Sequence, residues 1–267
     1  MIAFTGTILE DLEAGRLRAA TPDAATPDGW RVDPAVKAAI LDCFRDRQTL
    51  DWNAGPLAFR DRVGVPPKQL FESVDGLAAE AAGRPWRIVP GGTSIRAGVH
   101  LEPGVVVMPP AFVNIGAWIG EYVMVDSHVL VGSCAQIGAR VHLAAAVQIG
   151  GVLEPAGARP VIVEDDAFVG AGSSLLEGVL VKAGAVIAAG VILTGTSTLY
   201  DLVNERILVG TVDQPLVVPA GAVVVPGSRP ARGAFAEQHG LGIATALIVK
   251  QRDAGTSARV ALEGAIR

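Results

Sequence analysis

The chain has 267 residues, of which half are hydrophobic and only 18% are charged, and it contains 32 glycines and 5% aromatic residues. Its 22 Lys and Arg against 27 Asp and Glu give a net charge of −5, which argues against a general nucleic-acid-binding protein because such proteins need a basic face. No continuous apolar run is long enough to cross a bilayer, so we expect no membrane partner.

The two cysteines, Cys43 and Cys134, lie far apart in the chain and lack metal-ligand spacing. This usage is typical of free thiols in a reducing compartment. The first residues also lack the basic and apolar stretches of a secretory signal, since charged residues interrupt them from Asp11 onward. We therefore expect a cytoplasmic protein.

Residues 1–85 are predicted to form a small, mostly helical N-terminal domain. In "DPAVKAAILDCF", Asp33 is placed to cap a helix, Pro34 suits its first turn, and the apolar residues recur at helical spacing. A second helix is expected near residues 71–82, ending before "GRP".

From residue 95 onward, an aliphatic residue returns every six positions. Ten successive positions from Ile95 to Ile149 are Ile, Leu or Val, and the period resumes from Val163 to Leu193. The interval between Ile149 and Val163 is two residues longer than two repeats. This excess predicts that "GGVLEPAGARPVI" contains a loop pushed out of a regular stack.

A six-residue period does not fit an α-helix, which has about 3.6 residues per turn. It fits a short strand and a tight turn, three of which close a triangular coil of about eighteen residues. Stacked coils would pair strand over strand at about 4.8 Å. Each inward aliphatic side chain would then pack on the aliphatic side chain eighteen residues further along the chain. We predict such a β-helix over residues 86–204.

Residues 205–267 have a different pattern. "RILVG", "LVVPAGAVVVPGS" and "TALIVKQ" indicate strands separated by Pro and Gly turns, and "ARVALEGAI" indicates a short tail helix. Because a β-helix has flat faces and no deep pocket of its own, a functional site would lie where neighbouring subunits meet. We therefore expect a homotrimer.

Several stretches are more specific than the six-residue period. They include "RIVPGGTSIRAGVHLEPGVVVMPPAFVNIGAW", "MVD", "VGSCAQIG", "IGGVLEP", "VIVEDDAFVGA" and "GTSTLYD". In these stretches the chain resembles the tetrahydrodipicolinate N-succinyltransferase family of hexapeptide-repeat acyltransferases. The resemblance implies a mainly β fold, namely a left-handed parallel β-helix with a small α-helical N-terminal domain and a short C-terminal β/α extension.

The resemblance also implies an activity. Members of this family transfer succinyl from succinyl-CoA to the amino group of tetrahydrodipicolinate, or of 2-amino-6-oxopimelate, in lysine and diaminopimelate biosynthesis. The expected partners are thus a dicarboxylic amino acid and an acyl-CoA co-substrate, with no permanently bound cofactor and no metal. Such a transfer needs a base for the ammonium, a cation for the carboxylates and N–H donors for the developing oxyanion.

Five positions carry the resemblance at the site. Asp126 in "MVD" would be a catalytic and substrate-binding aspartate, and Arg87 in "WRIVP" a substrate-binding arginine. CoA would lie against the Gly-rich turns at Gly170 and Gly190, with Lys250 in "LIVK" near its phosphates. Structural interpretations stay open, because Asp126 could cap a turn, Arg87 could pair with a surface carboxylate and Lys250 could be a solvated strand end.

The chain departs from the family pattern at two places. "MVDSH" puts His128 where the family has an aromatic indole, and "GAGSS" puts Gly172 and Ser174 where it has an arginine and a glutamate. We hypothesise that His128 shares the base role, since imidazole suits proton transfer near neutrality, and that Ser174 lines the substrate pocket. The alternative is a paralogue in specialised metabolism that uses acetyl-CoA or a related amino-acid acceptor.

Two other functional classes remain open. A metal enzyme of the γ-carbonic-anhydrase kind would need three convergent imidazoles, but His100, His128 and His142 are not separated by whole coils, which places them on different faces. A non-catalytic trimeric scaffold is the other alternative, and binding of CoA thioesters would distinguish it from an acyltransferase.

Overall fold

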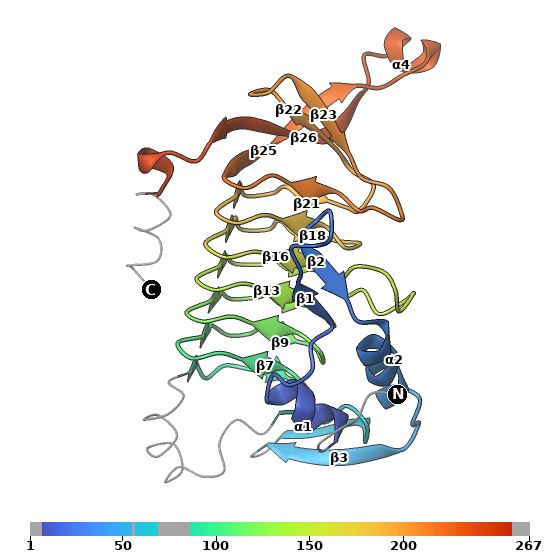
Figure 1. The fold of residues 1–267 in the computed structure, drawn as a ribbon, viewed down its shortest axis with the longest axis vertical. Helices are drawn as coiled ribbons and strands as arrows, with labels where there is room; N and C mark the ends of the chain where they lie inside the picture. The colour runs from blue at the N-terminus through green and yellow to red at the C-terminus, as the bar shows by residue number, and fades with distance from the viewer. Residues whose placement is uncertain (1–6, 55–56, 69–85, 258–267) are drawn as a thin grey trace.

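The computed structural model describes residues 7–54, 57–68 and 86–257, and the helices expected near 71–82 and in the C-terminal tail lie outside these ranges. Its centre is an upright triangular prism of short parallel strands, with N-terminal elements along one side and a C-terminal hairpin on top (Figure 1). This is the left-handed parallel β-helix that the sequence predicts. Each coil contributes one strand to each of three faces, which we call faces I, II and III.

The three faces consist of two-residue strands. Face I contains β5 (Arg87–Ile88), β8 (Val106–Val107), β11 (Met124–Val125), β14 (His142–Leu143), β17 (Phe168–Val169) and β20 (Val186–Ile187). Face II contains β6 (Ser94–Ile95), β9 (Phe112–Val113), β12 (Leu130–Val131), β15 (Gln148–Ile149), β18 (Ser174–Leu175) and β21 (Ile192–Leu193). Face III contains β7 (His100–Leu101), β10 (Trp118–Ile119), β13 (Gln136–Ile137), β16 (Ile162–Val163), β19 (Leu180–Val181) and β24 (Val217–Val218).

The eighteen-residue register is confirmed by the strand pairing. Ile119 of β10 pairs with Leu101 of β7 below it and with Ile137 of β13 above it. All three side chains are buried in one core that runs through the prism. Each strand turns its second residue inward, which explains why an aliphatic residue must return every six positions.

The irregular interval is also confirmed as a loop outside the stack. β16 follows β13 on face III although Gln136 and its partner Ile162 are 26 residues apart. Residues 150–160, between β15 and β16, contain no strand and lie at the edge between faces II and III. The loop therefore leaves the core unchanged and adds backbone beside the N-terminal segment.

The N-terminal elements cover face III and the edge between faces II and III. They are α1 (Ile8–Glu13), β1 (Ala20–Pro22), β2 (Trp30–Val32), α2 (Pro34–Cys43), β3 (Thr49–Ala54) and β4 (Leu57–Arg62). Asp33 caps α2 by accepting the N–H groups of Ala35 and Val36, and Pro34 begins the helix, as predicted. Trp30 packs with Ile162 on face III.

The described part of this segment is less helical than the sequence indicates. It contains two antiparallel strand pairs, β1 with β2 and β3 with β4, besides the two helices. β1 and β2 are only three residues long and are formed by pairing and by packing on face III. Strands this short have no clear alternating pattern, so a sequence reading misses them.

The C-terminal residues form two hairpins on the last coil, paired with each other in one sheet, and we call this unit the C-terminal hairpin. Its elements are β22 (Thr198–Asp201), β23 (Arg206–Val209), β25 (Ala222–Pro230), α4 (Ala234–Gln238) and β26 (Gly242–Gln251). The stack continues past the expected end at residue 204, because β24 pairs with β19 and the start of β25 pairs with β20. The β22–β23 hairpin is thus an insertion, after which the coil resumes.

Two further expectations concern the thiols and the membrane. Cys43 and Cys134 are both free, and burial raises the pKa of Cys134 to about 12, so that its thiol is neutral and unreactive near pH 7. Among the described residues, no helix is long and apolar enough to cross a membrane.

Candidate functional site

The edge between faces I and II, which we call the I–II edge, contains most of the residues singled out in the sequence. At each of the four turns of this edge from residue 126 upward, one residue adopts a positive φ angle, namely His128 at 62°, Ala146 at 60°, Gly172 at 68° and Gly190 at 75°. Each of them donates its backbone N–H to a carbonyl of the turn below. Going up the stack, the side chains at this position shrink from imidazole to methyl to hydrogen.

Asp126 and His128 lie in one turn of the I–II edge. Asp126 directly follows β11 and is 6% exposed, and its Oδ1 accepts the backbone N–H of Ser127 at 2.8 Å. His128 is exposed, and its own N–H donates to the carbonyl of Pro110 at 2.6 Å. The carboxylate thus has the turn-capping contact of its structural interpretation, while remaining two residues from an exposed imidazole.

Ser174 lies on face II beside the same edge. It pairs with Gln148 below and Ile192 above. The Gln148 amide donates to the carbonyls of His128 and Ala146, at 3.4 and 3.3 Å, which ties face II to the turns of the edge. The structure therefore places Ser174 two rungs above the His128 turn, on the adjoining face.

The two glycines predicted to contact CoA differ in their surroundings. A Cβ at Gly170 would lie 2.4 Å from the backbone nitrogen of Ala189, so the close approach of two turns already requires glycine there. A Cβ at Gly190 would meet nothing within 4 Å. Packing thus explains Gly170, whereas Gly190 faces open space and stays available to a ligand.

Arg87 and Lys250 lie towards opposite ends of the sheet on face I. Arg87 is exposed on β5, two strands below Met124, which corresponds to about 10 Å along the stack. Lys250 pairs with Val223 on the last strands, and its ammonium bonds Asp253 at 2.7 Å. The structure does not bring Lys250 near Asp126, since five strand spacings, about 24 Å, separate Lys250 from the level of Met124.

A cavity of about 430 Å³ lies at the top of face II, and Gly190 is the only site residue predicted from the sequence among the described residues that line it. It opens between the last coil and the C-terminal hairpin, and Gly190 of the I–II edge lines it. Its other lining residues are small, aliphatic or hydroxylated, apart from Arg229 of β25. We call it the hairpin cavity. The sequence "VVVPGSRPAR" does not predict the position of Arg229, because nothing in it indicates which coil turn the hairpin approaches.

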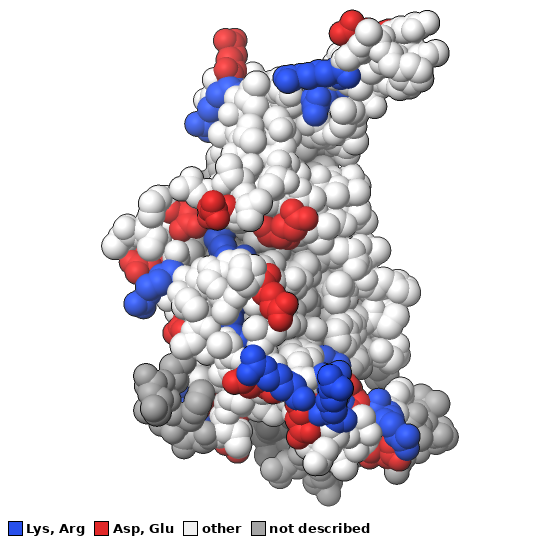
Figure 2. Space-filling view, turned by 90° about the vertical axis from the view of Figure 1, so that its right-hand side faces the viewer, with Lys and Arg blue, Asp and Glu red and all other residues white. Residues whose placement is uncertain are grey.

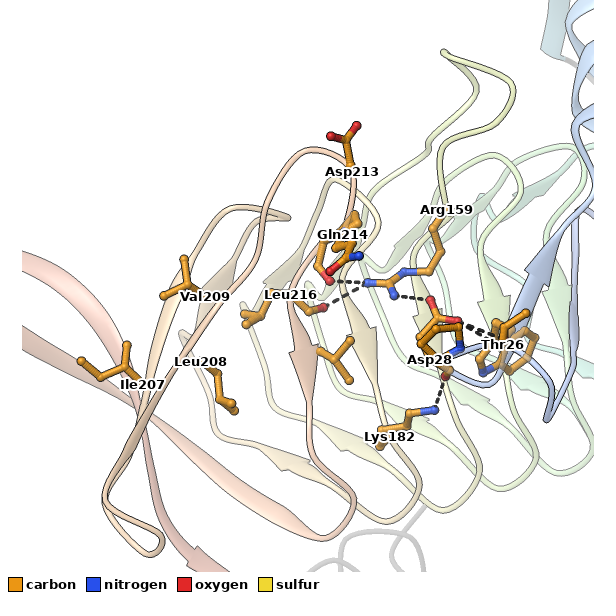
Figure 3. A pocket seen from close by; sticks show the side chains of 14 residues that line it. Thr26, Asp28, Arg159, Lys182, Ile207, Leu208, Val209, Asp213, Gln214 and Leu216 are labelled. Atoms are coloured by element: carbon orange, nitrogen blue, oxygen red, sulfur yellow. Dashed lines mark hydrogen bonds and ion pairs between the residues drawn. The ribbon is translucent and has the colours of Figure 1, made fainter.

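A larger cavity of about 770 Å³ lies on the other side of the molecule, between the β1–β2 segment and residues 207–217 (Figure 3). Its cations are engaged within the chain. Arg159 donates to Asp28 at 2.6 Å and to the carbonyls of Pro215 and Leu216, and Lys182 donates to the Asp28 carbonyl. Burial alone would raise the pKa of Asp28, but the hydrogen bond and charge of Arg159, with hydrogen bonds from the Trp30 N–H and Thr26, together lower that pKa. This cavity contains none of the predicted site residues. Its hydrogen bonds connect the N-terminal segment to the β-helix, which indicates a structural role.

The histidines do not converge. His100 lies on face III, with Nδ1 2.8 Å from the Glu13 carbonyl and Nε2 2.8 Å from Glu102, and it stacks on Trp118. His142 lies on face I against Phe168, and His128 on the I–II edge. No cluster of three His, Cys, Asp or Glu residues suited to a metal occurs in the part of the chain that the structure describes.

Charged side chains are unevenly distributed on the surface. Figure 2 shows Lys, Arg, Asp and Glu gathered over one half of the molecule's side and at its ends, beside a broad strip of prism wall without charge. The six turns of the I–II edge, residues 90–93, 108–111, 126–129, 144–147, 170–173 and 188–191, contain one acidic residue, Asp126, and no Lys or Arg. Asp126 is therefore the single carboxylate on an otherwise uncharged edge.

The fold and the edge define a class of protein, the hexapeptide-repeat transferases. The family model described as "Hexapeptide repeat of succinyl-transferase" matches residues 160–195. The chain is 40% identical over 264 residues to the 2,3,4,5-tetrahydropyridine-2,6-dicarboxylate N-succinyltransferase of Bordetella pertussis, a match that covers 97% of this chain and 87% of that relative. The chain belongs to the 2,3,4,5-tetrahydropyridine-2,6-dicarboxylate N-succinyltransferase family.

Two other comparisons agree with this family. The enzyme of the same name from Albidiferax ferrireducens is 40% identical over 266 residues, again covering 97% of this chain and 87% of that one. The one from Idiomarina loihiensis is 44% identical over 117 residues, which are 44% of this chain and 39% of that relative.

A solved structure has the same fold. The protein, from Campylobacter jejuni, is assigned as a 2,3,4,5-tetrahydropyridine-2-carboxylate N-succinyltransferase. It has a TM-score of 0.51 at 17% identity, over 89% of this chain and 60% of its own length. At this identity the likeness concerns the fold alone.

Proposed function

We propose that this protein transfers the succinyl group of succinyl-CoA to the amino group of tetrahydrodipicolinate, or its ring-opened form 2-amino-6-oxopimelate, in lysine and diaminopimelate biosynthesis. The observation that carries the proposal is the match over 97% of the chain to relatives named for this reaction. The site supports it, because Asp126 of the "MVD" motif is the one carboxylate on the otherwise uncharged I–II edge.

The chemistry assigns a role to each group. The Asp126 carboxylate, with His128 beside it, accepts a proton from the substrate ammonium, because only the free amine attacks a thioester. A carbon–nitrogen bond forms, the carbon–sulfur bond breaks, and the CoA sulfur leaves with a proton. Arg87 holds a substrate carboxylate, and Ser174 offers its hydroxyl to the same substrate. Succinyl-CoA is a co-substrate consumed at each turnover, and the site needs no resident cofactor or metal.

We propose further that the working unit is a homotrimer, with the substrates bound between two chains. The outward side chains of face I above Arg87 are apolar or aromatic, namely Val106, Met124, His142, Phe168 and Val186. The described N-terminal segment packs on face III instead. A second chain against face I would place Asp126 and Arg87 in a cleft between subunits. The two free thiols favour the cytoplasm as the compartment.

One observation favours the second candidate, transfer of acetyl or use of a related amino-acid acceptor. Gly172 stands where the family pattern has an arginine, and a Cβ there would meet nothing within 4 Å. The pocket therefore lacks a cation at that position. Its absence weakens the binding of the succinyl carboxylate, whereas an uncharged acyl group is not affected.

A thiol-release assay tests both candidates. Succinyl-CoA and acetyl-CoA are each combined with tetrahydrodipicolinate, 2-aminopimelate and related amino acids, and free CoA is measured. We expect succinyl-CoA with tetrahydrodipicolinate to give the highest kcat/KM. A preference for acetyl-CoA or another acceptor would select the paralogue, and no thiol release with any pair would reject acyl transfer.

Asp126→Asn provides the matching test within the site. The amide oxygen can still accept the Ser127 N–H, so the turn is preserved, but the base is lost. We expect kcat to fall about 100-fold or more. Asp165→Asn is the matched control, because Asp165 also caps a turn, accepting the Ala139 N–H at 2.9 Å, at the edge between faces III and I. Equal activity of both variants would remove Asp126 from the mechanism.

A further inference from the structure

We infer that Arg229 is a specificity-determining residue for the acyl donor and binds a phosphate group at the nucleotide end of acyl-CoA. This inference rests on the proposed function and names the subsite in which the donor is recognised. It replaces Lys250, the cation that the sequence predicts for this role.

The first argument is the free charge of Arg229. Among the described residues that line the hairpin cavity, it is the one charged residue. Among the described residues, nothing forms a hydrogen bond or ion pair with its guanidinium, whereas Lys250 bonds Asp253 and Arg252 bonds the carbonyls of Asp166 and Gly184. An unengaged guanidinium presents a planar set of donors that matches phosphate oxygens.

The second argument is the composition of the cavity wall. Thr194 and Ser197 lie with their hydroxyl oxygens 3.2 Å apart, and Thr245 contributes a third hydroxyl. Thr245 donates its hydroxyl to the Thr198 carbonyl, and one hydroxyl of the Thr194–Ser197 pair donates to the other, so the remaining hydroxyl of that pair can donate to a phosphate oxygen. Ile192, whose side chain is 65% exposed, forms an apolar wall next to them. A ligand with an anionic end and an aliphatic arm satisfies both parts of the cavity.

The third argument is the open strip that leads from the cavity down the I–II edge. The backbone does not require glycine at Gly172 and Gly190, because two other residues of the edge adopt the same positive φ. These are Ala146, one turn below Gly172, and His128, two turns below it. Packing does not require it either, because a Cβ at each glycine would meet nothing within 4 Å. The missing side chains therefore leave free surface that a ligand can contact.

The length of this strip fits the donor. Three coil spacings separate His128 from Gly190, which is about 14 Å. The pantetheine arm of CoA contains two amide units and has about the length of four extended residues, or about 14 Å. A thioester at the Asp126 turn would then place the phosphates beside Arg229.

Arg229→Gln tests the inference with three donors. These are succinyl-CoA, its analogue without the 3′-phosphate and succinyl-pantetheine, which carries no phosphate. With succinyl-CoA we expect KM to rise about 10-fold or more, because a charge-assisted hydrogen bond is lost, with kcat within about 2-fold of the parent. With succinyl-pantetheine, parent and variant should have the same KM. The 3′-dephospho analogue identifies the phosphate, since it abolishes the difference only if Arg229 binds the 3′-phosphate and otherwise retains it.

Arg232→Gln is the matched control, because Arg232 is exposed a few residues further along and does not line the cavity. It should leave KM for every donor unchanged. An unchanged KM of Arg229→Gln with succinyl-CoA, or an equal rise with succinyl-pantetheine, would overturn the inference. The result is distinguishable from failure of the proposed function, because in that case the parent protein itself releases no thiol.

A second pair of variants tests the strip. Gly190→Ala places a methyl on the strip, and Gly184→Ala places one at the edge between faces III and I, with a similar φ of +66° and only Arg252 nearby. The backbone strain is therefore matched. We expect KM for succinyl-CoA to rise only in Gly190→Ala, and equal KM values in the two variants would contradict a donor lying along the I–II edge.

Discussion

At the scale of single residues, a positive-φ position in a turn presents a side chain that the packing of the prism does not need. His128 occupies such a position, with an exposed side chain and an N–H bound to Pro110. Its ring is therefore not needed for packing, although its backbone conformation is needed for the turn. Asn is well tolerated in the left-handed region, so it removes the imidazole and keeps the turn.

His128→Asn tests whether the imidazole shares the base role. We expect kcat/KM to fall about 100-fold near neutral pH, because a positioned general base contributes about that factor or more. The pH profile of kcat/KM separates this role from a structural one, since loss of a base changes the limb of the profile and loss of packing lowers it evenly. Unchanged turnover would leave Asp126 as the sole base.

At the scale of elements, the loop at residues 150–160 joins parts of the chain that the prism alone would leave separate. Lys37 of α2 donates to the carbonyls of Pro155 and Ala158 in this loop. Arg159, at its end, bonds Asp28 of the N-terminal segment and the backbone near β24. The loop therefore holds the N-terminal elements against face III.

Asp28→Asn tests this joint through the dependence of stability on pH. The pKa of Asp28 is lowered in the folded protein, so the carboxylate adds stability above its unfolded pKa of about 4, and this contribution is lost as the pH falls through the lower folded pKa. Urea unfolding should show the variant destabilised by about 1 kcal/mol at pH 7 and nearly equal to the parent once the pH has fallen below the folded pKa of Asp28. A constant difference between pH 7 and pH 2 would assign the effect to something other than this charge.

At the scale of the whole molecule, the sequence predicts the prism well and the site less well. A position such as Ile119 can be predicted because one repeated requirement, an inward aliphatic residue on each strand, is visible along the chain. Arg229 cannot, because its place depends on how the hairpin folds over the last coil. The partner of Lys250 is a similar case, since only the structure shows its bond to Asp253.

Phe168→Arg tests assembly through face I. We expect the parent to sediment at three times the chain mass of 27.4 kDa, and the variant to dissociate and lose thiol-release activity, because an unpaired charge would be buried between chains. Val212→Arg is the control, because Val212 is 84% exposed and lies away from face I. A parent that sediments as a single chain would refute the trimer.

The repetition of the prism has a consequence for the evolution of donor choice. Every coil contributes the same rise, so the span from the Asp126 turn to the hairpin is an integer number of rungs. Duplicating or deleting one eighteen-residue unit between them would alter that span by about 4.8 Å while each new strand still found a matching neighbour. The number of coils between the Asp126 turn and the hairpin would therefore set the length of the donor arm that the proposed site can hold.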